Sequence, residues 1–172
     1  PSDDVEARQM IKAAYEFEGP VYLRLGRSPV PVYHEESYKF KIGKGELVHE
    51  GTDVAIIATG ILVPEAIEAA ELLEKEGIKA RVINMPTIKP LDEEMVLAAA
   101  KDCGTIVTVE EHNVIGGLGE AVCGLLAEKQ PVRVKRLGTN DQFGHSGDAG
   151  ELLEQFGLAA KNIAKAAKSL AK

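Results

Sequence analysis

Short unbroken apolar runs alternate along most of the chain with longer stretches in which apolar residues recur every three or four positions. The run from Asp53 to Ala58 is almost wholly apolar, which is typical of a strand buried on both faces of a parallel sheet. The stretch that follows has the helical period, with Pro64 in its first turn and Gly77 just beyond its end. Its apolar positions share one helical face: Leu62, Ala66, Ala69, Ala70 and Leu73. This pattern predicts a strand followed by a helix that covers it.

The same alternation continues to the end of the chain. Further strands are predicted over residues 80–85, 105–109 and 132–137, and further helices over residues 92–100, 118–128, 148–156 and 159–170. Repeated strand–helix–strand units require right-handed crossovers and therefore mainly parallel strands. We predict an α/β fold, a three-layer sandwich with a mainly parallel, roughly five-stranded sheet and helices on both faces.

The N-terminal part of the chain has a different pattern. A helix is predicted from an N-cap at Asp3 or Asp4 to Phe17, where a Gly-Pro pair ends it, and Val21 to Leu25 has the composition of a strand. One helix and one strand cannot enclose a core, so we expect this part to pack against something outside the chain. A proline-rich, polar stretch follows and predicts a linker.

These differences divide the chain into three parts. Residues 1–33 form one piece, residues 34–48 the linker, and residues 49–172 the α/β domain.

Composition and charge narrow the class of protein. The 172 residues are 45% hydrophobic and 27% charged, as in an ordinary globular domain. The net charge of −7 argues against a nucleic-acid partner, because that binding depends on neutralising phosphates. The longest apolar run, residues 54–58, is far shorter than the ~20 residues that span a bilayer, so we expect no membrane partner.

Targeting signals and cysteines indicate the compartment. The first residues lack the pattern of a signal peptide. Cys103 and Cys123 have no histidine nearby at ligand spacing, which favours buried thiols in a reducing environment over a zinc site. We therefore expect a cytoplasmic protein in which no residue binds a metal.

The glycine-rich segment from Glu110 to Gly119 follows a predicted strand and opens a predicted helix. One interpretation is a phosphate cradle of backbone amides at a helix N-terminus. The spacing imitates a dinucleotide fingerprint, but it has Val122 in place of the third glycine and lies on the third strand of the domain. A tight turn with close helix–strand packing is the favoured alternative.

The polar residues of the same segment could carry chemistry. Glu110, Glu111 and His112 could form an acid–base or metal-binding group. Adjacent carboxylates on an extended strand point to opposite sides, however, and no third metal ligand can be placed. A hydrogen-bonded cluster, at a subunit contact for example, is favoured.

Two other segments carry candidate residues. His145 lies in a loop, residues 141–147, that lacks the spacing of a serine-hydrolase nucleophile elbow, so a structural histidine is favoured there. Arg24 and Arg27 lie at and just beyond the predicted strand 21–25. Arginine is suited to bidentate binding of carboxylate or phosphate, although two surface arginines are the simpler interpretation.

Together these segments resemble transketolase-type enzymes, and they follow the order of that family over nearly the whole chain. The matching segments are Gly19–Arg27 (the end of the pyrimidine-binding domain), Gly51–Gly60, Val82–Asp92, Glu110–Gly119, Phe143–Gly147, Glu151–Leu153 and Phe156–Leu158 (successive parts of the C-terminal domain). The resemblance implies a remnant of the pyrimidine-binding domain followed by a transketolase C-terminal domain.

The resemblance also implies the cofactors thiamine diphosphate and Mg2+ in the complete enzyme. The family binds them through a Gly-Asp-Gly…Asn motif and a glutamate of the pyrimidine domain, and neither has a counterpart here. We therefore expect no cofactor-binding and no catalytic residue in this chain, which is either a fragment or a subunit of a split enzyme. Arg27 matches a family arginine that binds the phosphate of the sugar substrate.

The implied function is ketol transfer between phosphosugars of the pentose phosphate type, as part of a larger chain or complex. The implied partners are an N-terminal transketolase section and a second copy in a homodimeric contact. Deoxyxylulose-phosphate synthase and the beta subunits of 2-oxo acid dehydrogenases are alternatives, although Phe143 to Gly147 favours transketolase. A non-catalytic binding or regulatory module of the same fold is a third possibility.

Overall fold

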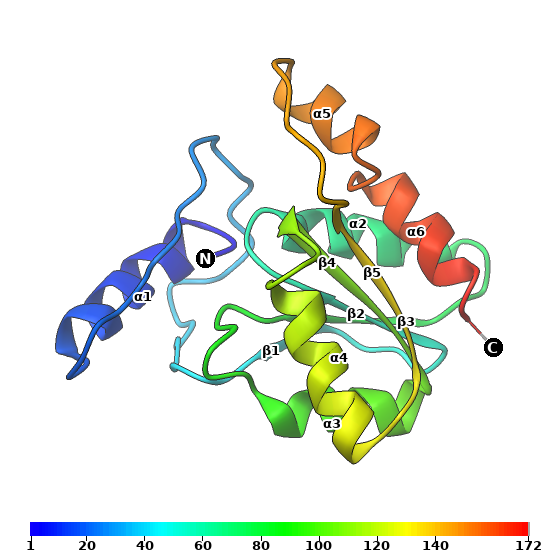
Figure 1. The fold of residues 1–172 in the computed structure, drawn as a ribbon, viewed down its shortest axis with the longest axis horizontal. Coiled ribbons are helices and arrows are strands. Elements are labelled where there is room, and N and C mark those ends of the chain that lie inside the picture. Colours follow the sequence, from blue (N-terminus) through cyan, green and yellow to red (C-terminus); the bar gives the residue numbers. More distant parts are fainter. Residues whose placement is uncertain (172) are drawn as a thin grey trace.

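The computed structural model describes residues 1–171 and contains one five-stranded sheet. Its strands are β1 (Glu46–His49), β2 (Val54–Ala58), β3 (Ala80–Asn84), β4 (Thr105–Asn113) and β5 (Arg133–Thr139). Their order across the sheet is β1-β3-β2-β4-β5, and only the pair β1–β3 is antiparallel (Figure 1). The predicted fold class is thus confirmed.

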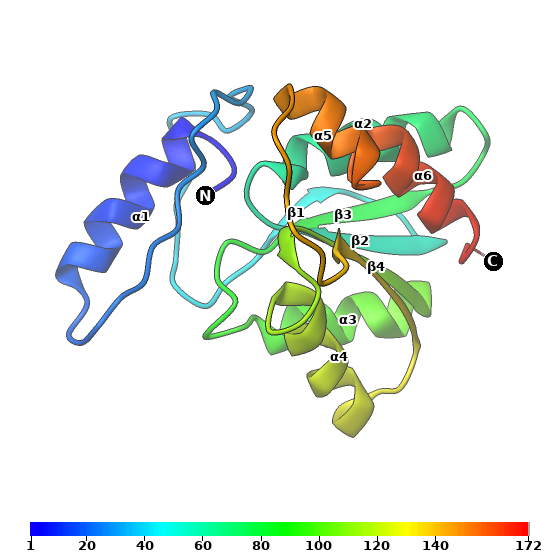
Figure 2. The ribbon, with the colours of Figure 1, turned by 45° about the horizontal axis from the view of Figure 1, so that its top comes forward.

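Helices cover both faces of the sheet, and Figure 2 shows the three layers. On one face lie α2 (Leu62–Glu74) and α6 (Ala160–Lys168), with α5 (Ala149–Gln155) beside them; on the other lie α3 (Glu93–Cys103) and α4 (Leu118–Lys129). β2 is wholly buried and contributes to both cores. Ile56 faces α2 and α6, whereas Ile57 faces α3 and α4.

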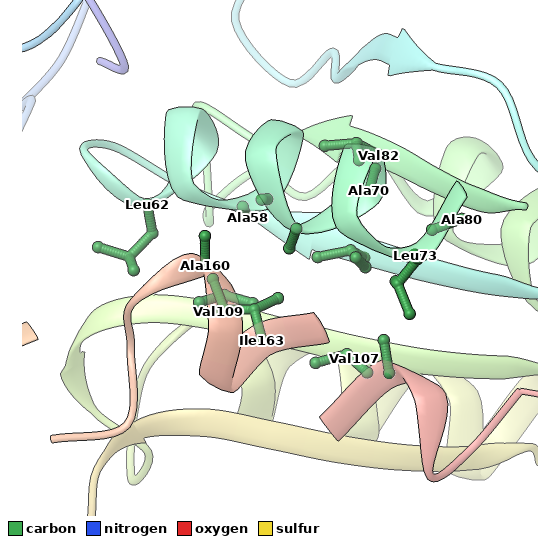
Figure 3. Close-up of a cluster of buried hydrophobic side chains, with 14 of the residues drawn as sticks. Ala58, Leu62, Ala70, Leu73, Ala80, Val82, Val107, Val109, Ala160 and Ile163 are labelled. Atoms are coloured by element: carbon green, nitrogen blue, oxygen red, sulfur yellow. The ribbon is translucent and has the colours of Figure 1, made fainter. Parts of the chain in front are cut away.

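The core between the sheet and α2 is built from small and branched side chains. Figure 3 shows it, with Leu73 from α2, Ile163 from α6 and Val107 from β4 in one cluster. Each of these side chains is almost completely buried, and a buried aliphatic side chain of this size stabilises a fold by ~1.5–3 kcal/mol. The chain has few aromatic residues, so its alanines and valines let the helices approach the sheet closely.

The strand order creates a topological switch point. The chain leaves β2 in one direction to reach β3 and then crosses back to β4 on the other side of β2. In open parallel sheets, ligands bind in the crevice where the strand order reverses, beyond the carboxyl ends of the strands. That place lies between the ends of β2 and β4, where the Thr59 amide donates to the Val109 carbonyl.

Two predicted details differ from the structure. Val21 to Leu25 forms no strand, because among residues 1–171 no other strand lies beside it to pair with its amides and carbonyls. The strand β1, in contrast, was not predicted, and all of it except His49 lies within the range expected to be linker. It is only four residues long and half-buried, so it has no long apolar run by which to recognise it.

The N-terminal arm, residues 4–27, comprises α1 (Asp4–Glu16) and the extended segment that runs back beside it. Asp3 caps the helix by accepting a hydrogen bond from the Glu6 amide at 2.9 Å. The first turns are buried through Val5, Glu6 and Met10, whereas the second half of α1 is exposed. In both views the far end of the arm stands away from the sheet (Figures 1 and 2).

Among residues 1–171, the helices are all too short or too polar to cross a membrane.

Candidate functional site

Glu110 occupies the helix N-terminus that the sequence suggests as a phosphate cradle. It lies near the end of β4, is 1% exposed, and accepts hydrogen bonds from the amides of Leu118 at 2.7 Å and Gly119 at 2.8 Å. A carboxylate at the start of α4 satisfies its free amides and offsets the helix dipole. A bound diphosphate would therefore have to displace a buried side chain of the protein itself.

The glycines of this turn are required by close packing. A Cβ on Gly117 would lie 1.9 Å from Glu110 Oε2, and one on Gly119 would lie 2.7 Å from Thr108 Oγ1. They thus serve the close approach of helix and strand, as the tight-turn interpretation predicts. The segment does not fit the diphosphate of thiamine diphosphate, and no other residue set in residues 1–171 has the expected binding motif.

The three polar residues at the end of β4 do not converge on one point. Glu110 is turned toward α4, whereas Glu111 is exposed and lies near Arg24. His112 is also exposed, and its Nδ1 lies 2.7 Å from the Asn113 carbonyl. In the part of the chain that the structure describes, no group of three or more His, Cys, Asp and Glu side chains could hold a metal ion.

Arg24 joins the N-terminal arm to the end of β4. Its Nη1 donates to the Glu111 carbonyl at 2.7 Å, and its Nη2 lies 4.0 Å from a Glu111 carboxylate oxygen. Both side chains are about half exposed, so the backbone contact is the stronger one. Arg24 therefore fixes the position of the segment that carries Arg27.

Arg27 lines a groove of about 950 Å³ beyond the carboxyl ends of β2 and β4. The walls are residues 26–31, the outer face of α2 and the stretch 144–158. Glu111 and His145 line the same groove, and the His145 ring stacks on Phe156 with 5.5 Å between ring centroids. The groove thus brings together three candidate residues that lie far apart in the sequence.

The structure also contains a buried polar cluster that the sequence patterns do not predict. It consists of Asp3, Glu6, His34, Glu46 and Asn84, together with the hydroxyl groups of Ser2, Tyr33 and Tyr38. It joins the start of α1 to β1 and β3, where Glu46 and Asn84 face each other in register. The predicted N-cap Asp3 was the one signal for it, because His34 lies in a stretch that reads as linker.

The histidine of this cluster lies between two carboxylates. His34 Nδ1 is 2.9 Å from Asp3 Oδ2, and His34 Nε2 is 2.7 Å from Glu46 Oε2. Burial alone would lower the pKa of His34, but the contacts with Asp3 and Glu46 outweigh it and raise this pKa above its ordinary value. Burial likewise opposes ionisation of Asp3, yet the amides of Glu6 and His34 and the imidazole keep the pKa of this carboxyl below its ordinary value.

Comparison with known proteins agrees with this architecture. Residues 43–163 match the family model described as the transketolase C-terminal domain. The chain is 46% identical to the 6-deoxy-6-sulfo-D-fructose transketolase subunit SqwH of Clostridium sp. (strain MSTE9), over 97% of this chain and 52% of that protein. It is 42% identical to the 1-deoxy-D-xylulose-5-phosphate synthase of Heliobacterium modesticaldum, over 99% of this chain and 27% of that protein.

A solved structure also matches nearly the whole chain. It is described as a split gene transketolase, inactive beta4 tetramer, and it superposes with a TM-score of 0.96 at 46% identity, over 99% of this chain and 56% of that one. This chain thus spans about half the length of the transketolase subunits it matches, and about a quarter of the synthase. The chain belongs to the transketolase family, and it contains that family's C-terminal domain.

Proposed function

We propose that this chain is the C-terminal section or subunit of a thiamine-diphosphate-dependent transketolase, which transfers a two-carbon ketol unit between phosphosugars. The observation that carries the proposal is the match of 97% of the chain to 52% of a protein named as a transketolase subunit. On this proposal the chain is inactive alone, and an N-terminal section completes the enzyme, either as a separate subunit or within a longer chain. Thiamine diphosphate and Mg2+ would be held by that section, and the cofactor would supply the electron sink for ketol transfer.

The contribution of this chain is to bind and orient the substrate. Arg27 lines a groove at the switch point of the sheet, and its guanidinium is free to form charge-assisted hydrogen bonds with a phosphate. Arg24 holds the preceding residues against the end of β4. We assign Arg27 to the substrate phosphate and Arg24 to the position of the arm.

The N-terminal section docks on the arm in this proposal. The arm carries large apolar side chains that are 46–91% exposed within residues 1–171: Ile11, Tyr15, Phe17, Val21, Tyr22 and Leu25. An exposed apolar patch of this kind is typical of a protein–protein contact. Val21 to Leu25 has a strand-like composition without a strand beside it, so pairing with a strand of the N-terminal section would satisfy its backbone.

Self-association and a cytoplasmic location complete the proposal. The relative of known structure is described as a beta4 tetramer, which supports contacts between copies of this chain as well. The buried Cys103 thiol donates to the Gly51 carbonyl at 3.7 Å, and a hydrogen-bonded thiol is compatible with a reducing compartment.

The synthase reaction is a second candidate, favoured by the 42% identity to a 1-deoxy-D-xylulose-5-phosphate synthase. The two reactions are distinguished by assaying the complete enzyme with a ketose-phosphate donor and with pyruvate, each together with an aldose-phosphate acceptor. We expect turnover with the ketose donor. Turnover with pyruvate but not with the ketose donor would favour the synthase. Turnover with neither donor would favour a non-catalytic module.

A further inference from the structure

In the buried cluster at the base of the N-terminal arm, a histidine lies between two carboxylates. Both ring nitrogens of His34 face carboxylate oxygens, Asp3 Oδ2 at 2.9 Å and Glu46 Oε2 at 2.7 Å. A carboxylate oxygen can only accept a hydrogen bond, and a neutral imidazole carries a proton on one nitrogen alone. In a neutral ring one lone pair would therefore face a buried negative charge.

The surroundings favour the doubly protonated ring. The side chains of His34 and Asp3 are 3% and 0% exposed, so water screens their contact only weakly, whereas the Glu46 side chain is 32% exposed. The rings of Tyr33 and Tyr38 flank it, with centroids 4.1 and 3.9 Å away, and aromatic faces attract a cation. The Nδ1 contact is close but not aligned as a straight hydrogen bond, so it acts mainly through charge.

The two carboxylates belong to different parts of the fold. Asp3 is the N-cap of α1, and Glu46 lies on the edge strand β1. The other titratable groups at this place are Glu6, Tyr33, Tyr38 and the Pro1 amino group, which interacts with Glu6 and Asp3. The Tyr38 hydroxyl donates to Glu6 at 2.7 Å. Of the acids Asp3, Glu6 and Glu46, the first two are nearly completely buried. The imidazolium is the cation that contacts both Asp3 and Glu46, and the Pro1 amino group also offsets Glu6 and Asp3.

We propose that His34 is a charge latch: as an imidazolium it holds the N-terminal arm against the edge of the sheet, and loss of its proton loosens the arm. The arm carries Arg24 and Arg27, so the latch also sets where these side chains stand relative to the groove. That consequence for Arg27 rests on the proposed function, whereas the latch itself does not.

The direction of the pH effect follows from the raised pKa of His34. The stabilisation is complete below the ordinary histidine pKa and is lost as the pH rises from there through the raised value. Within that window the equilibrium constant for docking of the arm falls by about tenfold per pH unit.

The chain offers matched controls in its other histidines. His49 is partly buried, but its Nδ1 lies 2.9 Å from the Ala80 carbonyl rather than a carboxylate, and His112 and His145 are exposed. In the complete protein labelled with 15N-histidine, we expect His34 to keep protons on both nitrogens to a higher pH than these three. The signal of His34 is identified by its absence from the spectrum of the His34→Gln variant. A His34 ring that loses a proton with or before the controls would overturn the latch.

Hydrogen exchange of the complete protein tests the mechanical part. After correction for the intrinsic pH dependence, residues 4–10 should lose protection as the pH rises, while residues 54–58 stay protected. His34→Gln should remove the pH dependence and His49→Gln should preserve it. If His34→Gln fails to fold, Glu46→Gln serves in its place and should shift the loss to lower pH. Protection that is independent of pH in the wild type, or equally dependent in His34→Gln, would refute the proposal.

Discussion

At the residue scale, the two amide contacts of Glu110 make it a structural residue rather than a catalytic one. Glu110→Ala leaves the amides of Leu118 and Gly119 buried without an acceptor, so we expect a loss of about 1–3 kcal/mol in the free energy of unfolding. Urea titration of the variant measures it. The control is Glu120→Ala, because Glu120 makes a similar contact with the Gly116 amide at the surface and should cost about 0.5 kcal/mol or less. Equal effects of the two substitutions would show that burial of Glu110 contributes nothing.

Arg27 differs from Arg24 in what it contacts, and this separates their expected effects. In the complete enzyme, Arg27→Ala should lower kcat/KM for phosphorylated substrates by roughly 10- to 150-fold, because one charge-assisted contact is lost. Unphosphorylated donors never engage the side chain and should show little change. Steady-state kinetics with both kinds of substrate measures the difference.

Arg24→Ala is the control for that experiment. Arg24 contacts Glu111 instead of lining the groove, so its removal should lower kcat/KM by less than removal of Arg27 does, and mainly for phosphorylated substrates through the position of Arg27. Equal losses on both kinds of substrate in Arg27→Ala would mean that Arg27 is also structural.

At the scale of elements, the apolar pattern predicts the strands and helices of the α/β domain well, because most of them bury apolar side chains in one of the two cores. The apolar pattern does not predict the part of a strand or helix that is formed by polar residues. β4 extends beyond the predicted end at residue 109 to Asn113, because its polar end pairs with β5 near Thr139. β1 is too short and too exposed to stand out, and Val21 to Leu25 has strand-like residues without a partner.

The candidate site was partly predictable for the same reasons. Arg27, Glu111 and His145 stand out in the sequence by type, but only the fold brings them to one groove. The cluster around His34 depends on contacts between Asp3, His34 and Glu46. Nothing local in the sequence marks such long-range polar contacts.

The N-terminal arm should be the least stable element when the 172-residue chain is studied by itself. Local stability follows buried contacts, and Val21 is 46% exposed where Val54 is completely buried. We expect fast hydrogen exchange over residues 21–25, intermediate exchange over residues 5–10, and slow exchange over β2. Protection of residues 21–25 equal to that of β2 would show that the segment is docked within the chain itself. Addition of the N-terminal section should slow exchange over residues 21–25.

At the scale of the whole molecule, the chain combines an α/β domain with an arm that leaves several large apolar side chains about half exposed or more. The domain has two well-packed cores, whereas the arm is attached mainly by the polar cluster at its base and by Arg24. Such a division suits a section whose stable part supports a second section.

We propose above all that this chain needs an N-terminal transketolase section to bind thiamine diphosphate. Calorimetric titration with the cofactor and Mg2+ tests it most directly, first on the 172-residue chain alone and then on the chain together with the N-terminal section. We expect no heat of binding in the first titration, because the glycine-rich start of α4 already holds the Glu110 carboxylate. We expect a saturable isotherm in the second. A saturable, micromolar isotherm for the chain alone would contradict it.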